Sequence, residues 1–261
     1  MKQVVSKDGT RIAYEKSGTG PPLVLVHGTG IDHTYWDLLV PILATDYCVY
    51  AIDRRGRGQS GDARPYALQR EFEDVVALIN SICEPVAVFG HSYGALCALE
   101  AATLTSHIRA LVLYEPPMYT TIEVSYPPDI LAKYESLLRD GKAEEALLML
   151  YQVGQTPAAD VNRFESLPNW QARVCAANTI PREVLSVRSY CFDPARFRGL
   201  TTPILFLLGS ETLPVYNAAT QVLHGSLPHS RVVILPDQSH DAAVTAPELV
   251  LREVGDFLRG D

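Results

Sequence analysis

The most informative stretch of the chain reads Val86-Ala87-Val88-Phe89-Gly90-His91-Ser92-Tyr93-Gly94-Ala95-Leu96-Cys97. It begins with an apolar run typical of a buried strand and continues into small residues that favour a helix. Between them lies the pattern Gly-x-Ser-x-Gly, centred on Ser92. A strand that turns directly into a helix strains the central residue, and glycines two residues away avoid collisions with neighbouring backbone. The stretch therefore predicts a serine hydroxyl exposed at a helix N-terminus, where the dipole favours developing negative charge.

Apolar runs on both sides of this stretch alternate with helical patterns. A hairpin through Asp8-Gly9 is expected first, between strands at 3–6 and 11–16. The later runs are apolar on both faces, as buried parallel strands are. The sequence therefore predicts an α/β protein with a mostly parallel, doubly wound sheet of about eight strands. The later strands are expected at 23–26, 48–52, 86–89, 108–114, 204–208 and 232–235, and the helices at 35–43, 68–81, 93–104, 216–227 and 247–258.

The alternation breaks between residues 118 and 197. Helical patterns occur there at 129–139 and 142–151, punctuated by prolines and without a convincing strand. Because the segment lies between two strands, we expect an insertion above the carboxyl edge of the sheet, where open α/β sheets place their ligand crevice. The predicted division is a core of residues 1–117 and 198–261 and a helical insertion of residues 118–197.

Four motifs give the chain a resemblance to the α/β-hydrolase superfamily over nearly its whole length. His27-Gly28-Thr29-Gly30 resembles the loop after the third strand of that family, and residues 53–60, which read DRRGRGQS, resemble the loop after the fourth. The serine turn follows the fifth strand, and His240 follows the last. The resemblance implies the α/β-hydrolase fold and a helical cap formed by the insertion. No nucleotide, flavin or metal motif is present, so no cofactor is expected.

Serine needs a general base to be nucleophilic near neutral pH. His240 is the predicted base of Ser92, since it lies between the last apolar run and the last helix, where the family places its histidine. The family usually carries its acid after the seventh strand, at a position that is Thr212 here. Glu115 is the favoured substitute, because a glutamate at the tip of a buried strand costs desolvation unless it is partnered. Glu211 is the alternative acid.

Acyl transfer places negative charge on a carbonyl oxygen, which paired backbone N–H groups stabilise. Tyr93 follows the nucleophile and is one predicted donor. Thr29 is the other, by the resemblance. Asp53 ends a strand, but we expect it to pair with the arginines at 54, 55 or 57 rather than to act in catalysis. The predicted pocket residues are His27, Met118, Tyr119 and Trp170, with stabilisation of its own loop as the alternative role of His27.

The composition of the chain argues against binding to nucleic acid or insertion into a membrane. The 261-residue chain has a net charge of −8, which argues against nucleic-acid binding because phosphate contacts need clustered Lys and Arg. No segment is apolar for the roughly 18 residues of a membrane span, and the N-terminus lacks a signal-peptide core. The five cysteines are odd in number and form no CxxC pair. We therefore expect buried free thiols in a reducing, cytoplasmic setting, with the oligomeric state left open.

These features predict a carboxylesterase-like serine hydrolase that forms an acyl-enzyme. Its expected substrate is a small, largely apolar ester, lactone or thioester. C–C bond hydrolysis or perhydrolase chemistry on the same residues is an alternative. A ligand receptor without catalysis is an alternative of another class, which the unusual acid turn favours and the intact Ser92 and His240 oppose. The serine argues against haloalkane dehalogenase or epoxide hydrolase chemistry, for which relatives use aspartate at that position.

Overall fold

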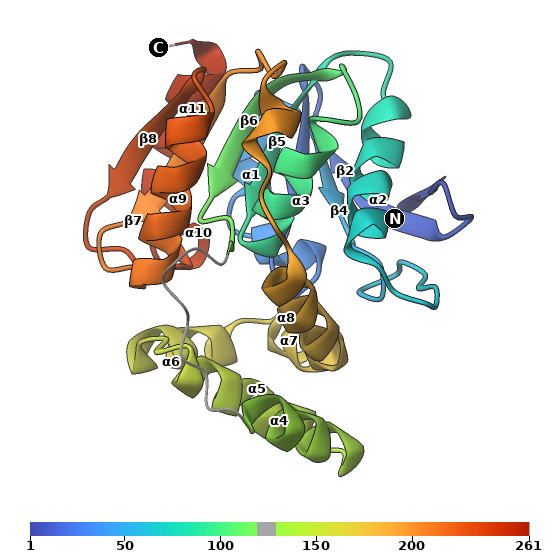
Figure 1. The fold of residues 1–261 in the computed structure, drawn as a ribbon, viewed down its shortest axis with the longest axis vertical. Coiled ribbons are helices and arrows are strands. Elements are labelled where there is room, and N and C mark those ends of the chain that lie inside the picture. The colour runs from blue at the N-terminus through green and yellow to red at the C-terminus, as the bar shows by residue number, and fades with distance from the viewer. Residues whose placement is uncertain (119–128, 261) are drawn as a thin grey trace.

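A computed structural model, which describes residues 1–118 and 129–260, contains one eight-stranded sheet (Figure 1). The strand order is β1-β2-β4-β3-β5-β6-β7-β8. The first hairpin and the β2–β4 pair are antiparallel, and every later pair is parallel. This confirms the predicted α/β class and mostly parallel sheet. The strands are β1 Lys2–Val5, β2 Arg11–Ser17, β3 Pro22–Val26, β4 Cys48–Ile52, β5 Val86–His91, β6 Ile108–Tyr114, β7 Ile204–Gly209 and β8 Ser230–Leu235.

Helices cover both faces of the sheet, because alternate residues of each central strand point to opposite sides. In β3, Val24 and Val26 join one apolar cluster, whereas Leu23 and Leu25 join the other. Helices α2 (Leu68–Asn80), α3 (Tyr93–Ala101) and α9 (Pro214–Ser226) contribute to the first cluster. Helices α1 (Val40–Leu43), α10 (Ala242–Thr245) and α11 (Pro247–Arg259) contribute to the second. The sheet is therefore doubly wound, as predicted.

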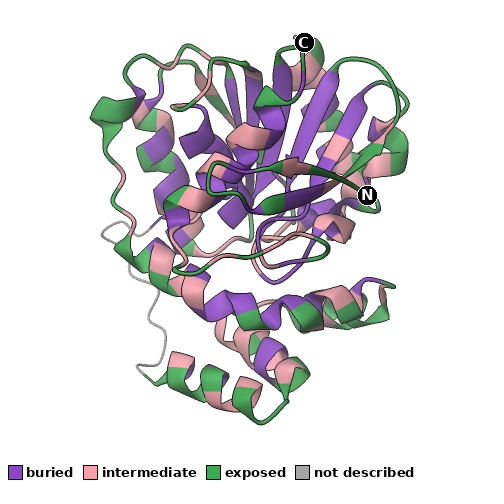
Figure 2. Cartoon of the chain, turned by 90° about the vertical axis from the view of Figure 1, so that its right-hand side faces the viewer, coloured by how far each residue is buried: buried purple, intermediate pink, exposed green. Residues whose placement is uncertain are grey.

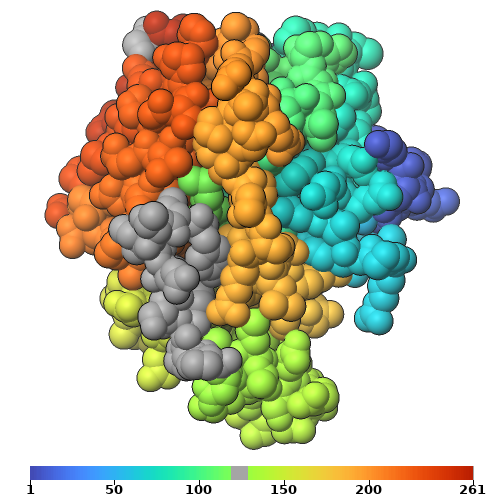
Figure 3. Space-filling view, viewed as in Figure 1, coloured from blue at the N-terminus to red at the C-terminus, as the bar shows by residue number. Residues whose placement is uncertain are grey.

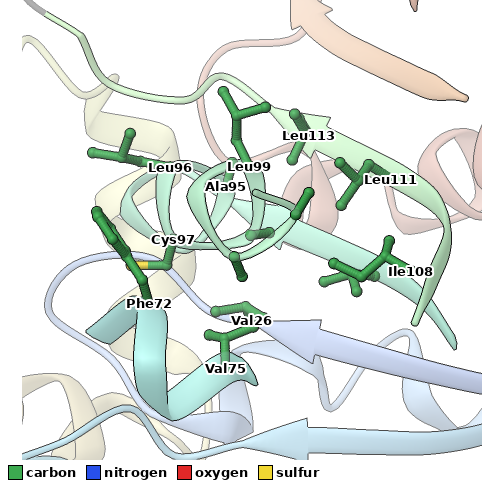
Figure 4. Packing of buried hydrophobic residues seen from close by; sticks show 14 of the residues in the cluster. Val26, Phe72, Val75, Ala95, Leu96, Cys97, Leu99, Ile108, Leu111 and Leu113 are labelled. Atoms are coloured by element: carbon green, nitrogen blue, oxygen red, sulfur yellow. The ribbon is translucent and has the colours of Figure 1, made fainter. Parts of the chain in front are cut away.

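Helix α3 lies deep in the first cluster. Each of its nine residues is buried, and Figure 4 shows Leu96, Cys97 and Leu99 among side chains of β3, β6 and α2. A helix that is apolar all round is stable only where protein surrounds it. This packing fixes the N-terminus of α3, and with it the residue that precedes the helix.

Within the described part of residues 118–197, every regular element is helical. The five α-helices lie beyond the carboxyl ends of the parallel strands (Figure 1). They have a small apolar cluster of their own, around Tyr134, Leu147 and Ile180. Figure 2 shows that exposed and half-buried residues are more frequent here than in the sheet, and in Figure 3 these helices form the lower end of the molecule. The helices are α4 Ile130–Arg139, α5 Ala143–Val153, α6 Ala158–Ser166, α7 Trp170–Ala176 and α8 Ile180–Ser189.

Three expectations need correction. The helix expected at 35–43 is a 3-10 turn, His33–Trp36, followed by the short α1, because Pro41 lacks the N–H that a continuous helix needs. Strand β8 is not buried on both faces, since it lies at the sheet edge and Ile234 is 52% exposed. All five cysteines are free, but those at 83, 175 and 191 are exposed; they lie outside the strands and the central helix α3. No helix among the described residues is long and apolar enough to cross a membrane.

Candidate active site

The turn between β5 and α3 has the strained geometry that the sequence predicts. Ser92 has φ 53° and ψ −124°, in a region that residues with side chains rarely adopt. A Cβ atom on Gly90 would lie 2.6 Å from the Cα of Ala95, and one on Gly94 would lie 2.2 Å from the carbonyl oxygen of Val26. Larger residues at either position would therefore displace the backbone that holds Ser92.

Ser92 and His240 lie on the wall of one cavity of about 240 Å³, although 147 residues separate them from each other in the sequence. Loops at the carboxyl ends of the strands form one side of the cavity, and helices α5, α7 and α8 form the other. Such a crevice is where parallel α/β sheets bind ligands. The apolar part of the wall includes Pro117, Leu147, Leu150, Ile180, Val184 and Leu213.

Glu115 is fully buried at the end of β6 and accepts a hydrogen bond of 2.5 Å from Nδ1 of His240. A carboxylate only accepts, so Nδ1 carries the proton and Nε2 of the neutral ring is free to act as a base. Burial alone would lower the pKa of His240, but the hydrogen bond and charge of Glu115, with the charge of Asp241, raise it. Glu115 itself has φ 47°, a second strained residue at this site.

The turn after β7 donates two hydrogen bonds to Glu115. The N–H of Gly209 donates to Oε1 of Glu115 at 2.8 Å, and the hydroxyl of Thr212 donates to Oε2 at 2.9 Å. Glu211 is exposed, with its carboxylate bonded to Ser210. The departure from the family pattern at Thr212 thus has a physical explanation, which removes the feature that favoured a receptor without catalysis.

Three aromatic side chains without a sequence signal of their own position the loop of His240. Nε2 of His91 donates to the backbone carbonyl of His240 at 2.8 Å, and burial lowers the pKa of His91 so that its ring is neutral. The hydroxyl of Tyr114 donates to the carbonyl of Ser239. The ring of Tyr216 stacks on the imidazole of His240 at 4.2 Å between centroids. Sequence adjacency to Ser92 and Glu115 was the only clue to His91 and Tyr114.

The backbone N–H groups of Tyr93 and Thr29 are available beside the serine. Tyr93 is the first residue of α3, so its N–H has no acceptor within the helix. A Cβ on Gly28 would lie 3.0 Å from the Cβ of Ser92, which places this loop against the serine. Nη1 of Arg54 donates to the Gly28 carbonyl at 2.9 Å. Because N–H and C=O point in opposite directions across a trans peptide, the N–H of Thr29 points away from Arg54, and Thr29 lines the cavity.

The structure places three predicted pocket residues elsewhere. His27 is fully buried, donates from Nδ1 to the Gly28 carbonyl and accepts from the Arg54 N–H at Nε2, so both ring nitrogens already hold their own loop. Met118 packs into the first apolar cluster. Trp170 packs between helices and donates to Glu144. None of the three is among the described residues of the cavity wall, and Tyr119 lies outside the described residues.

The expected pairing of Asp53 with the neighbouring arginines is wrong. Asp53 accepts instead from Nδ1 of His33 at 2.6 Å and from the N–H groups of His33 and Gln59. The side chains of Asp32, His33 and Asp53 have the spacing of a cation site. The Asp32 carboxylate already accepts two hydrogen bonds from Thr34, however, so internal hydrogen bonds already engage these groups.

The three arginines of the loop pair with carboxylates from two other regions. Arg54 binds Glu71 of α2 through Nε and Nη2, at 3.0 and 3.1 Å. Arg54 and Arg57 both contact Glu183 of α8. Arg55 binds Asp74 at 2.7 Å. These pairs are buried, and those with Glu183 join the sheet to the helices across the cavity.

A comparison with known proteins identifies the family of the chain. Residues 23–253 match the model of the alpha/beta hydrolase family. The chain belongs to the alpha/beta hydrolase family. It is accordingly an enzyme of the hydrolase class.

Individual relatives of this alpha/beta hydrolase cover nearly its whole length. A pimeloyl-[acyl-carrier protein] methyl ester esterase of Aeromonas hydrophila is 26% identical over 257 residues, 95% of this chain and 99% of the relative. The putative carbamate hydrolase RutD of Escherichia coli is 28% identical over 87% of each chain. The crystal structure of an alpha/beta hydrolase from Sphaerobacter thermophilus is 33% identical, with a TM-score of 0.84 over 98% of this chain and 100% of that one.

Proposed function

We propose that this hydrolase cleaves a carboxylic ester, lactone or thioester through an acyl-enzyme on Ser92, with His240 as general base and Glu115 as the acid that orients it. The observation that carries the proposal is the hydrogen bond of 2.5 Å between Glu115 and His240, beside a cavity that Ser92 also lines. A serine, a histidine and a carboxylate in such an arrangement form the catalytic triad of serine hydrolases.

In the proposed first step, the hydroxyl of Ser92 attacks the substrate carbonyl and gives its proton to Nε2 of His240. The buried carboxylate of Glu115 stabilises the imidazolium that forms. The N–H groups of Thr29 and Tyr93 donate to the oxyanion, and each such donor is worth about 3 kcal/mol in the transition state. His240 then protonates the leaving group. In the second step, His240 takes a proton from water as the water attacks the acyl carbon, and then returns a proton to the oxygen of Ser92 as the acid product leaves.

The cavity favours a small acyl group. Its volume of about 240 Å³ lies just below the 300–1,000 Å³ that is usual for drug-sized ligands. Much of its wall is aliphatic. The names of the relatives, a methyl ester esterase and a putative carbamate hydrolase, agree with attack on an acyl carbon that bears a small leaving group.

The helices on the other side of the cavity are part of the same proposal. We assign residues 118–197 to a cap that shapes the substrate pocket, and residues 1–117 and 198–261 to the core that holds the reacting groups. Leu147 of α5 and Ile180 of α8 line the cavity, which supports this division. Buried pairs of Arg54 and Arg57 with Glu183 tie the two parts together.

Labelling with a fluorophosphonate and hydrolysis of short nitrophenyl esters test the proposal on wild type and Ser92→Ala. Wild type is expected to be labelled at Ser92 and to turn over the esters. Ser92→Ala is expected to lose labelling and to lose about 10³-fold or more in kcat. Unlabelled Ser92 and equal turnover by both proteins would overturn the assignment.

A further inference from the structure

One buried cation on the cavity wall has no ion-pair partner among residues 1–118 and 129–260. Arg173 of α7 is 3% exposed and lines the cavity that Ser92 and His240 share. Its Nη1 donates to the hydroxyl of Tyr151 at 3.0 Å. Nε and Nη2 have no hydrogen-bond partner among the described residues. A buried guanidinium left in this state costs free energy, so pairing of Nε and Nη2 with an anion would be favourable.

Two other arginines of this chain bind carboxylates through the same two nitrogens, Nε and Nη2, that are unpaired in Arg173. Nε and Nη2 lie on one edge of the guanidinium, and Arg54 uses this edge for the two oxygens of Glu71, at 3.0 and 3.1 Å. Arg55 uses it for the two oxygens of Asp74, at 2.7 Å each. Two parallel N–H···O bonds of this kind are the geometry in which arginine recognises a carboxylate. The edge that such a fork requires is thus unpaired in Arg173 as far as the described residues show.

The surroundings of Arg173 hold the side chain in place without neutralising it. The guanidinium lies over the ring of Phe164 at 4.4 Å from its centroid, an attraction that supports a cation without using its N–H groups. Burial disfavours the charged form, but the nearby Tyr151 and Asp241 keep the pKa of Arg173 raised. The side chain therefore presents a fixed positive charge at any working pH.

The other charged side chains of the cavity do not take this edge. Glu183 is bound to Arg54 and Arg57. Glu211 is exposed. Asp241 lines the cavity near Arg173 without forming an ion pair with it, and burial raises the pKa of the Asp241 carboxyl. Among the described residues of the cavity wall, Arg173 is therefore the cation whose side chain keeps unpaired N–H donors.

We propose that Arg173 binds a free carboxylate of the substrate, so that the preferred substrates are short half-esters of dicarboxylic acids. This inference rests on the proposed function and narrows its substrate class. The ester carbonyl reacts at Ser92 while the distal carboxylate pairs with Arg173. In this arrangement, the aliphatic wall surrounds the few methylene groups between the two ends.

The test compares the monomethyl and dimethyl esters of succinate, glutarate and adipate, which differ within each pair in the free carboxylate. Wild type is expected to favour at least one monoester over its diester in kcat/KM. Arg173→Met, which keeps an apolar side chain of similar length, is expected to lose about 10- to 100-fold on that monoester and little on the diester. Arg173→Lys keeps the positive charge but cannot form two parallel N–H···O bonds, so its kcat/KM on the monoester should lie between those of wild type and Arg173→Met. The matched control is Arg163→Met, at an exposed arginine of α6.

A binding measurement separates this inference from the proposed function. Glutarate is expected to raise the Tm of wild type but not that of Arg173→Met, whether or not any ester is hydrolysed. Unlabelled Ser92 with this binding pattern intact would reject the hydrolytic mechanism and keep the anion site. Turnover of the diesters without a monoester preference, and with Arg173→Met behaving as wild type, would overturn the inference and keep the mechanism.

The Tm of Arg173→Met without ligand distinguishes recognition from a structural role. Removing an unpaired buried charge is expected to leave the Tm unchanged or to raise it. A large fall in Tm, together with the absence of any glutarate effect on wild type, would assign Arg173 to the fold as a counterion of Asp241 and overturn the proposal.

Discussion

The two sides of the cavity differ in how their polar groups are satisfied. On the sheet side, Glu115 accepts from Gly209, Thr212 and His240, and His240 is held by its neighbours. On the helical side, the wall includes five aliphatic side chains from α5 and α8, and Arg173 keeps two N–H donors unpaired among the described residues. A fully bonded set of groups is preorganised for one chemical step. An unpaired cation in an apolar wall is suited to selecting a ligand.

The buried links between the two sides add to this contrast. Glu183 of the helical side pairs with Arg54 and Arg57 of the sheet side, and all three side chains are buried. Buried pairs are costly to break singly, because the remaining partner is left as an uncompensated charge. In the proposed mechanism, reaction and recognition use separate elements, which the buried Glu183 contacts join. Each of the following predictions tests one part of this difference.

The largest expected effect is on the sheet side. Glu115→Gln keeps the shape of the side chain but removes the charge that stabilises the imidazolium of His240. We expect kcat to fall by about 10³- to 10⁴-fold. Glu211→Gln, at the exposed carboxylate of the next turn, should have a far smaller effect. Steady-state kinetics on a nitrophenyl ester compare the two, and the reverse ranking would transfer the acid role to Glu211.

The next effect concerns the link between the sides. Glu183→Ala leaves Arg54 and Arg57 with Glu71 as their one remaining carboxylate partner within the part of the chain that the structure describes. The free energy of unfolding should decrease by about 3–5 kcal/mol, as measured by urea denaturation. Glu165→Ala, at an exposed position of α6, is the control and should change stability little. Equal stability of the two variants would show that the link does not hold the sides together.

A smaller effect is expected in the pH dependence of the reaction. His240 must be neutral to accept the proton of Ser92, and its pKa is raised above 6.5. The acid limb of kcat/KM should therefore have its midpoint above pH 6.5. Asp241 is one of the charges that raise this pKa, so Asp241→Asn should move the midpoint to lower pH. A midpoint that moves up, or that moves equally in Asp256→Asn on α11, would contradict this assignment.

The smallest effect is expected for a charge pair on the outside of the helical segment. Lys142 and Glu145 pair at 3.2 Å with side chains that are 50% and 59% exposed. Lys142→Ala should change the free energy of unfolding by about 0.5 kcal/mol or less. The same urea titration measures it. If Lys142→Ala lowered the free energy of unfolding as much as Glu183→Ala, burial would not explain the difference between exposed and buried ion pairs.

The sequence alone predicted the fold class and indicated Ser92, His240 and Glu115 as candidate site residues, with Glu211 as the alternative acid. Each lies at or after the end of a strand, and strand ends are marked locally by an apolar run and a polar or glycine-rich stop. The strain at Ser92 was predictable for the same reason, because it arises from one turn and its two glycines. Local sequence was less informative for the short helices between residues 157 and 189, because prolines at 157, 168 and 181 lie at or between the helix ends and leave few turns in each helix.

Only the tertiary structure decided which groups meet across the molecule. Thr212 bonds to Glu115, 97 residues earlier, Glu183 pairs with Arg54, 129 residues earlier, and the free edge of Arg173 is visible only once its surroundings are known. His27, Met118 and Trp170 matched a pocket by position but are held by their own loop or by packing. Which side chains form a hydrogen bond or ion pair depends on their distance and burial in three dimensions. The periodicity of the sequence encodes neither of these.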